Sequence, residues 1–129
     1  MPLAGGRCPL YDIRANPGGP LTQAIKVSGE FLRRGDMVVY TEGRVSNSSQ
    51  KYVATEATEF TDVPMVVIAN RNSASASEIF TGALQDRGRA VVVGSRTFGK
   101  GSVQMPTELP DGSVAELTVG HYRPPAGVA

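Results

Sequence analysis

The sequence is poor in the residues that most often hold metals or act as bases. Among 129 residues it has one cysteine, Cys8, and one histidine, His121. A single cysteine excludes a disulfide within the chain and leaves its redox compartment open. A structural zinc site takes about four Cys or His ligands and a catalytic one about three, so no metal site is expected. The commonest general base, histidine, is scarce as well.

A strong charge of one sign and a long apolar run are also missing. The 13 Lys and Arg residues nearly balance the 12 Asp and Glu residues, for a net charge of +1. Nucleic-acid binding depends on clustered cations, so no such partner is expected. No apolar run of about 18 residues occurs, and the first ten residues lack the basic-then-apolar order of a signal peptide. The sequence therefore predicts no membrane segment.

Glycine and proline are plentiful, with 15 and 9 residues, and apolar residues make up 40% of the chain. Such a composition is typical of a folded domain with many turns. The length allows one domain with a hydrophobic core and is short for two. We therefore expect a single domain over residues 1–129.

Short β-branched runs alternate with helical periodicity, which predicts an α/β domain with a mostly parallel sheet. The apolar run at 65–69 and the similar run at 90–94 are typical of strands buried on both faces. The turn signal at 110–113 indicates a hairpin. The expected strands are 10–14, 37–40, 65–69, 90–94, 101–105 and 114–119, and the expected helices are 21–32, ending before Gly35, and 76–87, ending before Gly88.

The segment 72–78 joins an expected buried strand to an expected helix, and its side chains are small. The first N–H groups of a helix lack internal partners, so a serine at this point would lie beside a site for developing negative charge. Ser75 and Glu78 also fit the Ser-x-x-Glu capping box, which only starts a helix. Taken alone, the segment favours the capping interpretation.

Four blocks change that balance: DIRANPGG at 12–19, SASASEI at 73–79, GALQD at 82–86 and TFGKG at 97–101. In this order they resemble the C-terminal processing peptidases, or tail-specific proteases, which are serine proteases with a Ser/Lys site. The resemblance covers most of residues 12–122. It implies an α/β spiral of ββα units like that of crotonase and Clp-type proteins, with no cofactor and a protein or peptide C-terminus as substrate. It also implies that the protein is located in the periplasm, the cell envelope or the thylakoid lumen.

By this resemblance Ser75 is the nucleophile and Lys100 the general base. They are 25 residues apart (100 − 75), enough for a helix and a strand to return the chain to the same end of a parallel sheet. Several family members have a glutamine at the position of Gln104, which would share a strand face with Lys100 and orient its amine. We expect all three to converge, with Ser75 near hydrogen-bond reach of Lys100. A surface lysine and a solvated glutamine are the structural alternatives.

The resemblance implies that the Ala76 N–H and the Gly18-Gly19 turn form the oxyanion hole, although the turn also fits an ordinary helix entry. Pro20 stands where the family usually has a larger aliphatic residue. Asp86, also considered in the family, is expected to have a structural role.

Two other functions stay open. The family usually adds a PDZ domain and flanking segments, which this sequence does not contain. We therefore expect a fragment of the catalytic core with little activity of its own, and a catalytically silent peptide-binding or scaffold fragment is the main alternative. An acyl-CoA enzyme on the related crotonase-type fold is a third possibility, but Ser75, Lys100 and Gln104 have no evident use with a thioester enolate.

Overall fold

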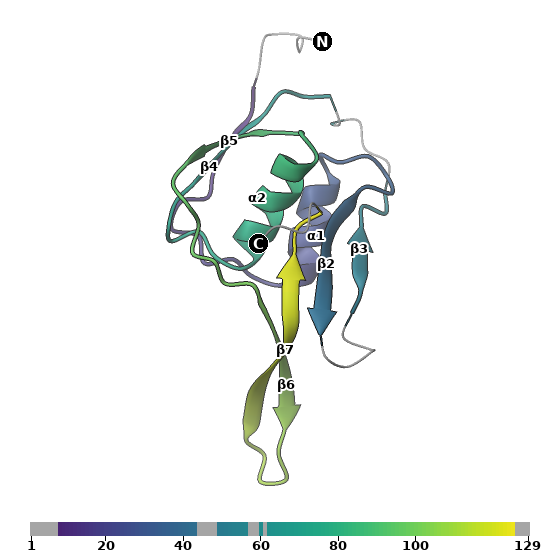
Figure 1. The fold of residues 1–129 in the computed structure, drawn as a ribbon, viewed down its shortest axis with the longest axis vertical. Helices are drawn as coiled ribbons and strands as arrows, with labels where there is room; N and C mark the ends of the chain where they lie inside the picture. The colour runs from purple at the N-terminus through teal and green to yellow at the C-terminus, as the bar shows by residue number, and fades with distance from the viewer. Residues whose placement is uncertain (1–7, 44–48, 57–59, 61, 126–129) are drawn as a thin grey trace.

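The computed structural model describes residues 8–43, 49–56, 60 and 62–125. Two helices and seven strands lie in this part of the chain (Figure 1). The helices are α1 (Leu21–Gly29) and α2 (Ala76–Asp86). The strands are β1 (Leu10–Asp12), β2 (Met37–Gly43), β3 (Lys51–Val53), β4 (Val66–Ala69), β5 (Val91–Gly94), β6 (Ser102–Glu108) and β7 (Val114–Arg123).

The strands form two separate sheets. Sheet A is parallel, with the order β1-β4-β5, and sheet B is antiparallel, with the order β3-β2-β7-β6. The α/β class is confirmed, but a mostly parallel sheet describes only sheet A, since four of the seven described strands belong to sheet B. Strand β3, which lies between the expected strands at 37–40 and 65–69, was not predicted.

The two helices lie between the sheets (Figure 1), and α2 contacts strands of both. The buried side chains of the two helices are mostly apolar and include Ile79, Phe80 and Leu84 of α2, which pack into the core. No helix in the described ranges is long and apolar enough to span a membrane. The largest fully buried side chains of the core are Leu32, Leu84, Val38, Val39 and Val67.

Helix α2 is fixed at both ends by local sequence. At its start the Ser75 N–H donates to the Glu78 carboxylate at 2.8 Å, half of the predicted capping box. At its end Gly88 has φ +63°, and the Gly88 and Arg89 N–H groups donate to the Gln85 and Leu84 carbonyls at 3.0 and 2.8 Å. This is a Schellman motif, so the predicted stop at Gly88 is confirmed.

The predicted end of α1 and the predicted burial of β5 differ from the structure. Helix α1 ends at Gly29, and Gly35, at φ +92°, lies in the turn before β2, where its N–H donates to the Ala54 carbonyl at 2.8 Å. Strand β5 is not buried on both faces: it ends sheet A, and Val91 and Val93 are 63% and 51% exposed. Its outward face is apolar and uncovered in this chain.

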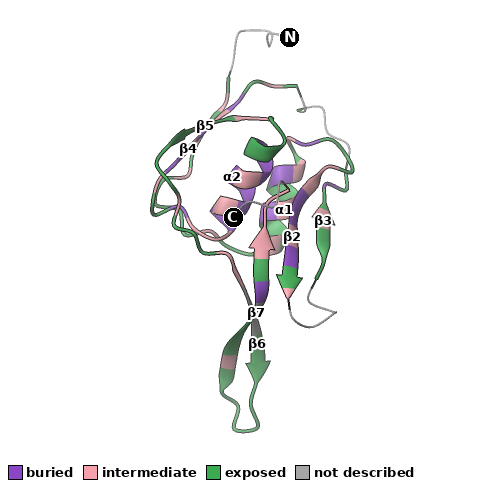
Figure 2. Cartoon of the chain, viewed as in Figure 1, coloured by how far each residue is buried: buried purple, intermediate pink, exposed green. Residues whose placement is uncertain are grey.

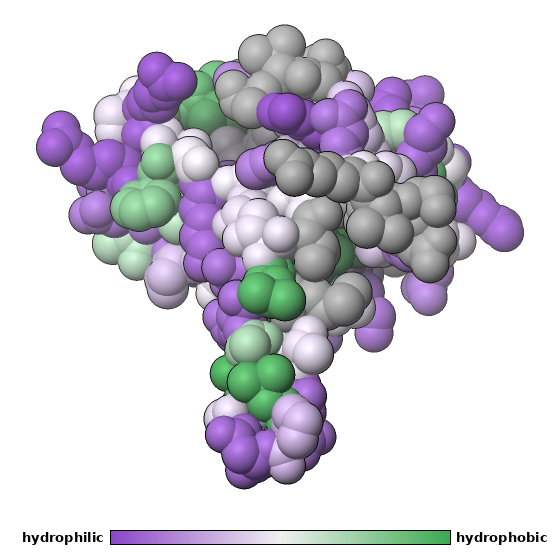
Figure 3. All heavy atoms as spheres, turned by 60° about the horizontal axis from the view of Figure 1, so that its bottom comes forward, coloured by the Kyte–Doolittle hydropathy of each residue, from purple (hydrophilic) through white to green (hydrophobic). Residues whose placement is uncertain are grey.

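Strands β6 and β7 form the predicted hairpin and project from the body as an arm (Figure 1). Its turn is closed by the Leu109 N–H donating to the Ser113 carbonyl at 2.7 Å. Most of the arm is exposed (Figure 2). Apolar side chains gather on it (Figure 3), and the exposed ones include Leu109, Val114 and Leu117. The second half of β7 returns to the body and pairs with β2.

Candidate active site

Three loops meet at one edge of sheet A, because the carboxyl ends of parallel strands lie together. They are residues 13–19 after β1, 70–75 after β4 and 95–101 after β5, called here the first, central and third loops. The central loop is bonded to both neighbours: the Ala74 N–H donates to the Asn16 carbonyl, and the Phe98 N–H to the Ser73 carbonyl, both at 3.0 Å. The central loop therefore fixes the other two in place.

Ser73 and Asn70 lock this junction from inside. The Ser73 hydroxyl is fully buried and donates to the Ile13 carbonyl at 2.7 Å, while it accepts the Asn70 N–H at 3.0 Å. The Asn70 side-chain oxygen accepts the Ala15 N–H at 3.0 Å. The Ser73 hydroxyl, which would otherwise be buried without a partner, thus ties the central loop to the end of the first strand region at Ile13.

Ser75 ends the central loop and immediately precedes α2. Its backbone angles are φ 55° and ψ −118°, outside the regions that non-glycine residues usually adopt. Such strain persists only where the surroundings hold it, and it gathers at functional sites. Ser75 thus lies at a sharp strand-to-helix turn, partly buried, at the positive end of the helix dipole.

The first loop approaches this turn as closely as backbone allows. Gly18, at φ +92°, has no side chain, and a Cβ there would lie 2.6 Å from the Ala76 nitrogen and 2.7 Å from the Ala74 carbonyl oxygen. The Gly18 N–H is occupied, since it donates to the Asn16 side-chain oxygen at 2.9 Å. Among the described residues, nothing accepts a hydrogen bond from the Gly19 or Ala76 N–H. Those two amides can still receive a ligand oxygen.

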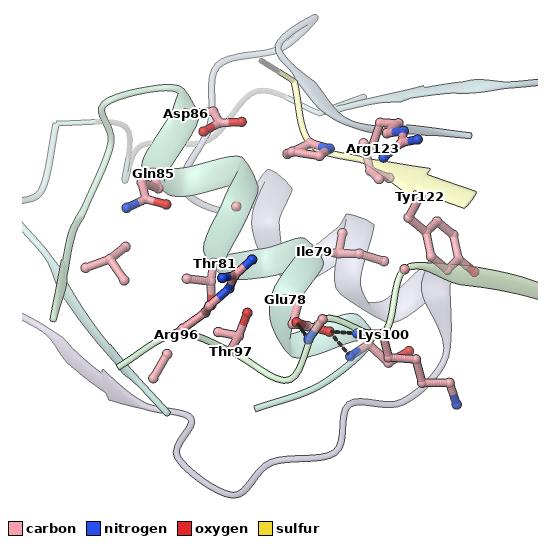
Figure 4. Close-up of a pocket in the computed structure, with 18 of the residues that line it drawn as sticks. Glu78, Ile79, Thr81, Gln85, Asp86, Arg96, Thr97, Lys100, Tyr122 and Arg123 are labelled. Carbon is pink, nitrogen blue, oxygen red and sulfur yellow. Dashed lines mark hydrogen bonds between the residues drawn. The ribbon is translucent and has the colours of Figure 1, made fainter. Parts of the chain in front are cut away.

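Lys100 lies in the third loop, before β6 begins. Its backbone N–H donates to the Glu78 carboxylate at 3.1 Å, and its exposed side chain points away from Glu78 (Figure 4). No hydrogen bond joins the Ser75 and Lys100 side chains in the described chain. Both residues nevertheless line the same cavity.

Gln104 lies apart from this pair. It is exposed on β6, opposite Thr118, next to a register shift between Val103 and Gln104, and it is not among the residues that line the cavity. Because β6 begins at Ser102, the strand alternation expected to place residues 100 and 104 on one face does not reach Lys100.

The cavity beside Ser75 has a volume of about 430 Å³, within the range of pockets that hold small ligands or side chains (Figure 4). Val38 and Val39 of β2 and Ile79 of α2 give it apolar walls. Asp86 lines it too, but it ends the 11-residue α2, so by helical rise it is about 16 Å from Ser75 along the axis. The charged residues that line the cavity are Glu78, Asp86, Arg96, Lys100 and Arg123.

The pKa values of two titratable groups, Asp12 and Tyr122, are shifted from their ordinary values. Asp12 ends β1 and holds the Arg14 guanidinium through two bonds of 2.9 and 2.7 Å, and this lowers the pKa of Asp12 to about 2. Burial of the Tyr122 ring, with a smaller contribution from Tyr52, raises the pKa of the Tyr122 phenol. Within the described residues no group of three or more His, Cys, Asp or Glu side chains could hold a metal ion.

Sequence reasoning missed one residue at the centre of the site. Glu78 was predicted to cap α2, and it does, but its carboxylate also accepts the N–H groups of Gly99 and Lys100. The Ser-x-x-Glu spacing predicts only the local bond. The contact with the third loop joins residues more than 20 positions apart, and no local pattern carries it.

Comparison with known proteins gives consistent matches. The sequence model of peptidase family S41 matches residues 10–129. The carboxy-terminal-processing protease of Bartonella bacilliformis is 43% identical over 120 residues, 93% of this chain and 27% of the relative. The carboxyl-terminal-processing protease of Picosynechococcus sp. is 46% identical over 116 residues, 90% of this chain and 27% of the relative. The solved photosystem II D1 C-terminal processing protease has a TM-score of 0.85 and 38% identity, covering 96% of this chain and 32% of that one. The chain thus spans about a quarter of the length of these two sequence relatives.

Proposed function

The chain belongs to peptidase family S41, and from this membership we propose that it forms the catalytic core of a serine endopeptidase that cleaves proteins near their C-termini. Ser75 is the proposed nucleophile and Lys100 the proposed general base. The preference for C-termini is supported by the names of the relatives, which are carboxyl-terminal-processing proteases.

The observation that carries the proposal is the strained turn at Ser75. A serine with φ 55° stands at the start of a helix, next to an Ala76 N–H that has no acceptor among the described residues. It lines a cavity that Lys100 also lines. A nucleophile, a base and an oxyanion donor at the mouth of one pocket are the parts that acyl transfer needs.

In the proposed reaction neutral Lys100 takes the proton of the Ser75 hydroxyl while the serine oxygen bonds to the substrate carbonyl carbon. The carbonyl oxygen becomes an oxyanion, which accepts hydrogen bonds from the Ala76 and Gly19 N–H groups. The protonated Lys100 gives its proton to the leaving amine, and water then hydrolyses the acyl-enzyme by the same route. The side chain of Lys100 must rotate toward Ser75, which its four flexible bonds permit.

We also propose that the domain is part of an α/β spiral of ββα units, as in crotonase and Clp-type proteins. In support, each described helix follows a strand of sheet A, β1 before α1 and β4 before α2, with strands of sheet B between the units. Gln104 is proposed as a third member of the site, which orients the Lys100 amine. Its support is weaker than that of Ser75 and Lys100, because it lies on β6 and does not line the cavity.

The test uses the chain at high concentration with an unstructured peptide ending in a free carboxylate, and mass spectrometry to detect the cut. Ser75→Ala and Lys100→Arg should each lower the rate at least about 10³-fold, because losing a member of a nucleophile-base unit removes most of the catalysis. Arginine keeps its proton at any working pH and cannot act as the base. Lys26→Arg on the exposed face of α1 is the matched control and should stay within about twofold. Cleavage retained in Lys100→Arg would refute the base assignment.

A catalytically silent peptide-binding core is the second candidate, favoured by the Lys100 side chain pointing away from the site (Figure 4). It predicts that the wild type and Ser75→Ala bind the same peptide equally and that neither cuts it. Peptide affinity measured by calorimetry, together with the absence of product, would distinguish it from the peptidase.

A further inference from the structure

A single carboxylate joins the proposed nucleophile turn to the proposed base loop. Glu78 Oε2 accepts the Ser75 N–H at 2.8 Å and the Lys100 N–H at 3.1 Å, while Oε1 accepts the Gly99 N–H at 2.5 Å (Figure 4). Glu78 is partly buried in the first turn of α2. Both oxygens are therefore occupied by main-chain donors, two of which come from the third loop.

This arrangement exceeds what a helix cap requires. A capping box uses the glutamate only for the N–H of the N-cap residue, here Ser75. The other backbone hydrogen bonds of the third loop lie on either side of this pair of amides. The Ser95 and Phe98 N–H groups donate to the Ala69 and Ser73 carbonyls at 3.2 and 3.0 Å, and the Gly101 carbonyl accepts the Tyr122 N–H at 2.6 Å. Beyond Phe98 the amides at positions 99 and 100 both end on Glu78.

We propose, on the basis of the proposed function, that Glu78 is a positioning residue that holds the Lys100 backbone at a fixed place relative to Ser75. It acts through main-chain N–H groups, so it orients the base without pairing with the Lys100 ammonium, whose stem points away from it (Figure 4). Displacements of about 1 Å in a catalytic pair can cost about 10²-fold in rate, so this anchor matters for catalysis.

The three bonds need a carboxylate. Hydrogen bonds to an ionised acceptor are about twice as strong as neutral ones. Glutamine has the same size but only one acceptor oxygen, so in Glu78→Gln an NH₂ group must face at least one N–H donor. Aspartate keeps both acceptors but is one methylene shorter, so it cannot reach Ser75 and the third loop together. The two variants separate loss of charge from loss of reach.

The experiment measures backbone amide exchange by NMR in the wild type, Glu78→Gln and Glu78→Asp. In both variants the exchange of the Gly99 and Lys100 amides should rise about tenfold or more, while the Leu84 amide within α2, which reports global opening, should keep its rate. Glu116→Gln, which removes a carboxylate from the exposed arm, is the matched control and should leave all three amides unchanged. Unchanged exchange at Gly99 and Lys100 in both Glu78 variants would overturn the proposal.

Peptide cleavage gives the second measurement. With the third loop released, kcat should fall about 10²-fold in Glu78→Gln while KM stays within about threefold, because placement of the base, and not substrate binding, is lost. Faster exchange with an unchanged kcat would refute the positioning role and leave the proposed peptidase intact. A wild-type chain that binds the peptide and cuts none of it would instead favour the silent peptide-binding core over the proposed peptidase, and the exchange rates alone would then decide whether Glu78 anchors the third loop. Should Glu78→Gln fail to fold, Glu78→Asp supplies both measurements.

Discussion

The substitution Gly18→Ala tests the close approach of the first loop to the Ser75 turn. A Cβ at Gly18 would lie 2.6 Å from the Ala76 nitrogen, 2.7 Å from the Ala74 carbonyl oxygen and 3.2 Å from the Ser75 Cβ. Two of these atoms are backbone and none is the end of a flexible side chain. The loop and the turn must therefore move apart to admit one methyl group.

The expected cost has two parts. Placing alanine at φ +92° costs about 1–2 kcal/mol, as for other L-residues in left-handed backbone. Overpacking against fixed neighbours adds about 1–3 kcal/mol. Alanine also lowers the conformational entropy of the unfolded chain, which offsets about 0.4–1 kcal/mol of this loss. The free energy of unfolding should thus fall by roughly 2–4 kcal/mol, which in a domain of this size lowers Tm by about 8–15 °C.

Two glycines serve as controls in the same thermal unfolding experiment, followed by circular dichroism. Gly35 has the same φ of +92° but open space around it, so Gly35→Ala isolates the backbone strain and should lower Tm by only about 2–6 °C. Gly19 has neither positive φ nor any atom within 4 Å, so Gly19→Ala should be neutral or slightly stabilising. If Gly18→Ala lowers Tm no further than Gly35→Ala does, the contact with the Ser75 turn does not constrain the fold and the reasoning is wrong.

Two further predictions concern the core and the Asp12 carboxylate. Leu84→Ala should cost about 2–5 kcal/mol in chemical unfolding, because Leu84 is 0% exposed, whereas Leu117→Ala, at 57% exposure on the arm, should cost under about 0.5 kcal/mol; equal losses would contradict the described core. NMR titration should find the pKa of Asp12 at about 2 and, in Arg14→Gln, closer to the ordinary 3.8. Since the folded pKa lies below the unfolded one, the pair stabilises the fold above about pH 4 and this contribution is lost as the pH falls toward 2; an unchanged Asp12 pKa in the variant would refute the assigned partner.

Local chemistry explains which elements were predictable. The α2 ends follow from Ser75, Glu78 and Gly88, and the hairpin follows from the turn at 110–113. Helix α1 was predicted too long because its apolar spacing continues beyond Gly29. There the chain makes tighter turns, in which the Glu30 and Phe31 N–H groups donate three residues back, and these keep the same side facing the core.

The environment of β5 was not predictable from its own sequence. A continuous run of valines shows that both faces are apolar, but it does not say whether another layer covers them. Val91 and Val93 are 63% and 51% exposed, so no described element covers the face of β5 on which they lie. The prediction of a mostly parallel sheet was wrong for the strands of sheet B for a related reason. The partner of a strand and its direction are set by tertiary contacts and not by the residues of the strand alone.

In the site, the 25-residue separation of Ser75 and Lys100 predicted that a helix and a strand return the chain to the same end of a parallel sheet. In the structure both residues lie in loops at one edge of sheet A. The Gln104 geometry depended on strand alternation, which fails because β6 starts two residues after Lys100. The strain at Ser75 and the contacts of Glu78 with the third loop had no signal in the sequence. Both arise from loops that are distant in the chain and meet only after folding.

The position of β6 at the border of sheet B has a consequence for how copies of this molecule meet. An open strand border with leucine and valine nearby is a template for association between molecules. Pro106 interrupts this border: it pairs with Glu116 of β7, and a proline within a strand has its nitrogen on the side away from its neighbour. A second strand laid along β6 would meet a ring carbon where it needs a donor. Pro106 therefore opposes pairing of β6 with a strand from the arm of another molecule, although the arm extends into solvent.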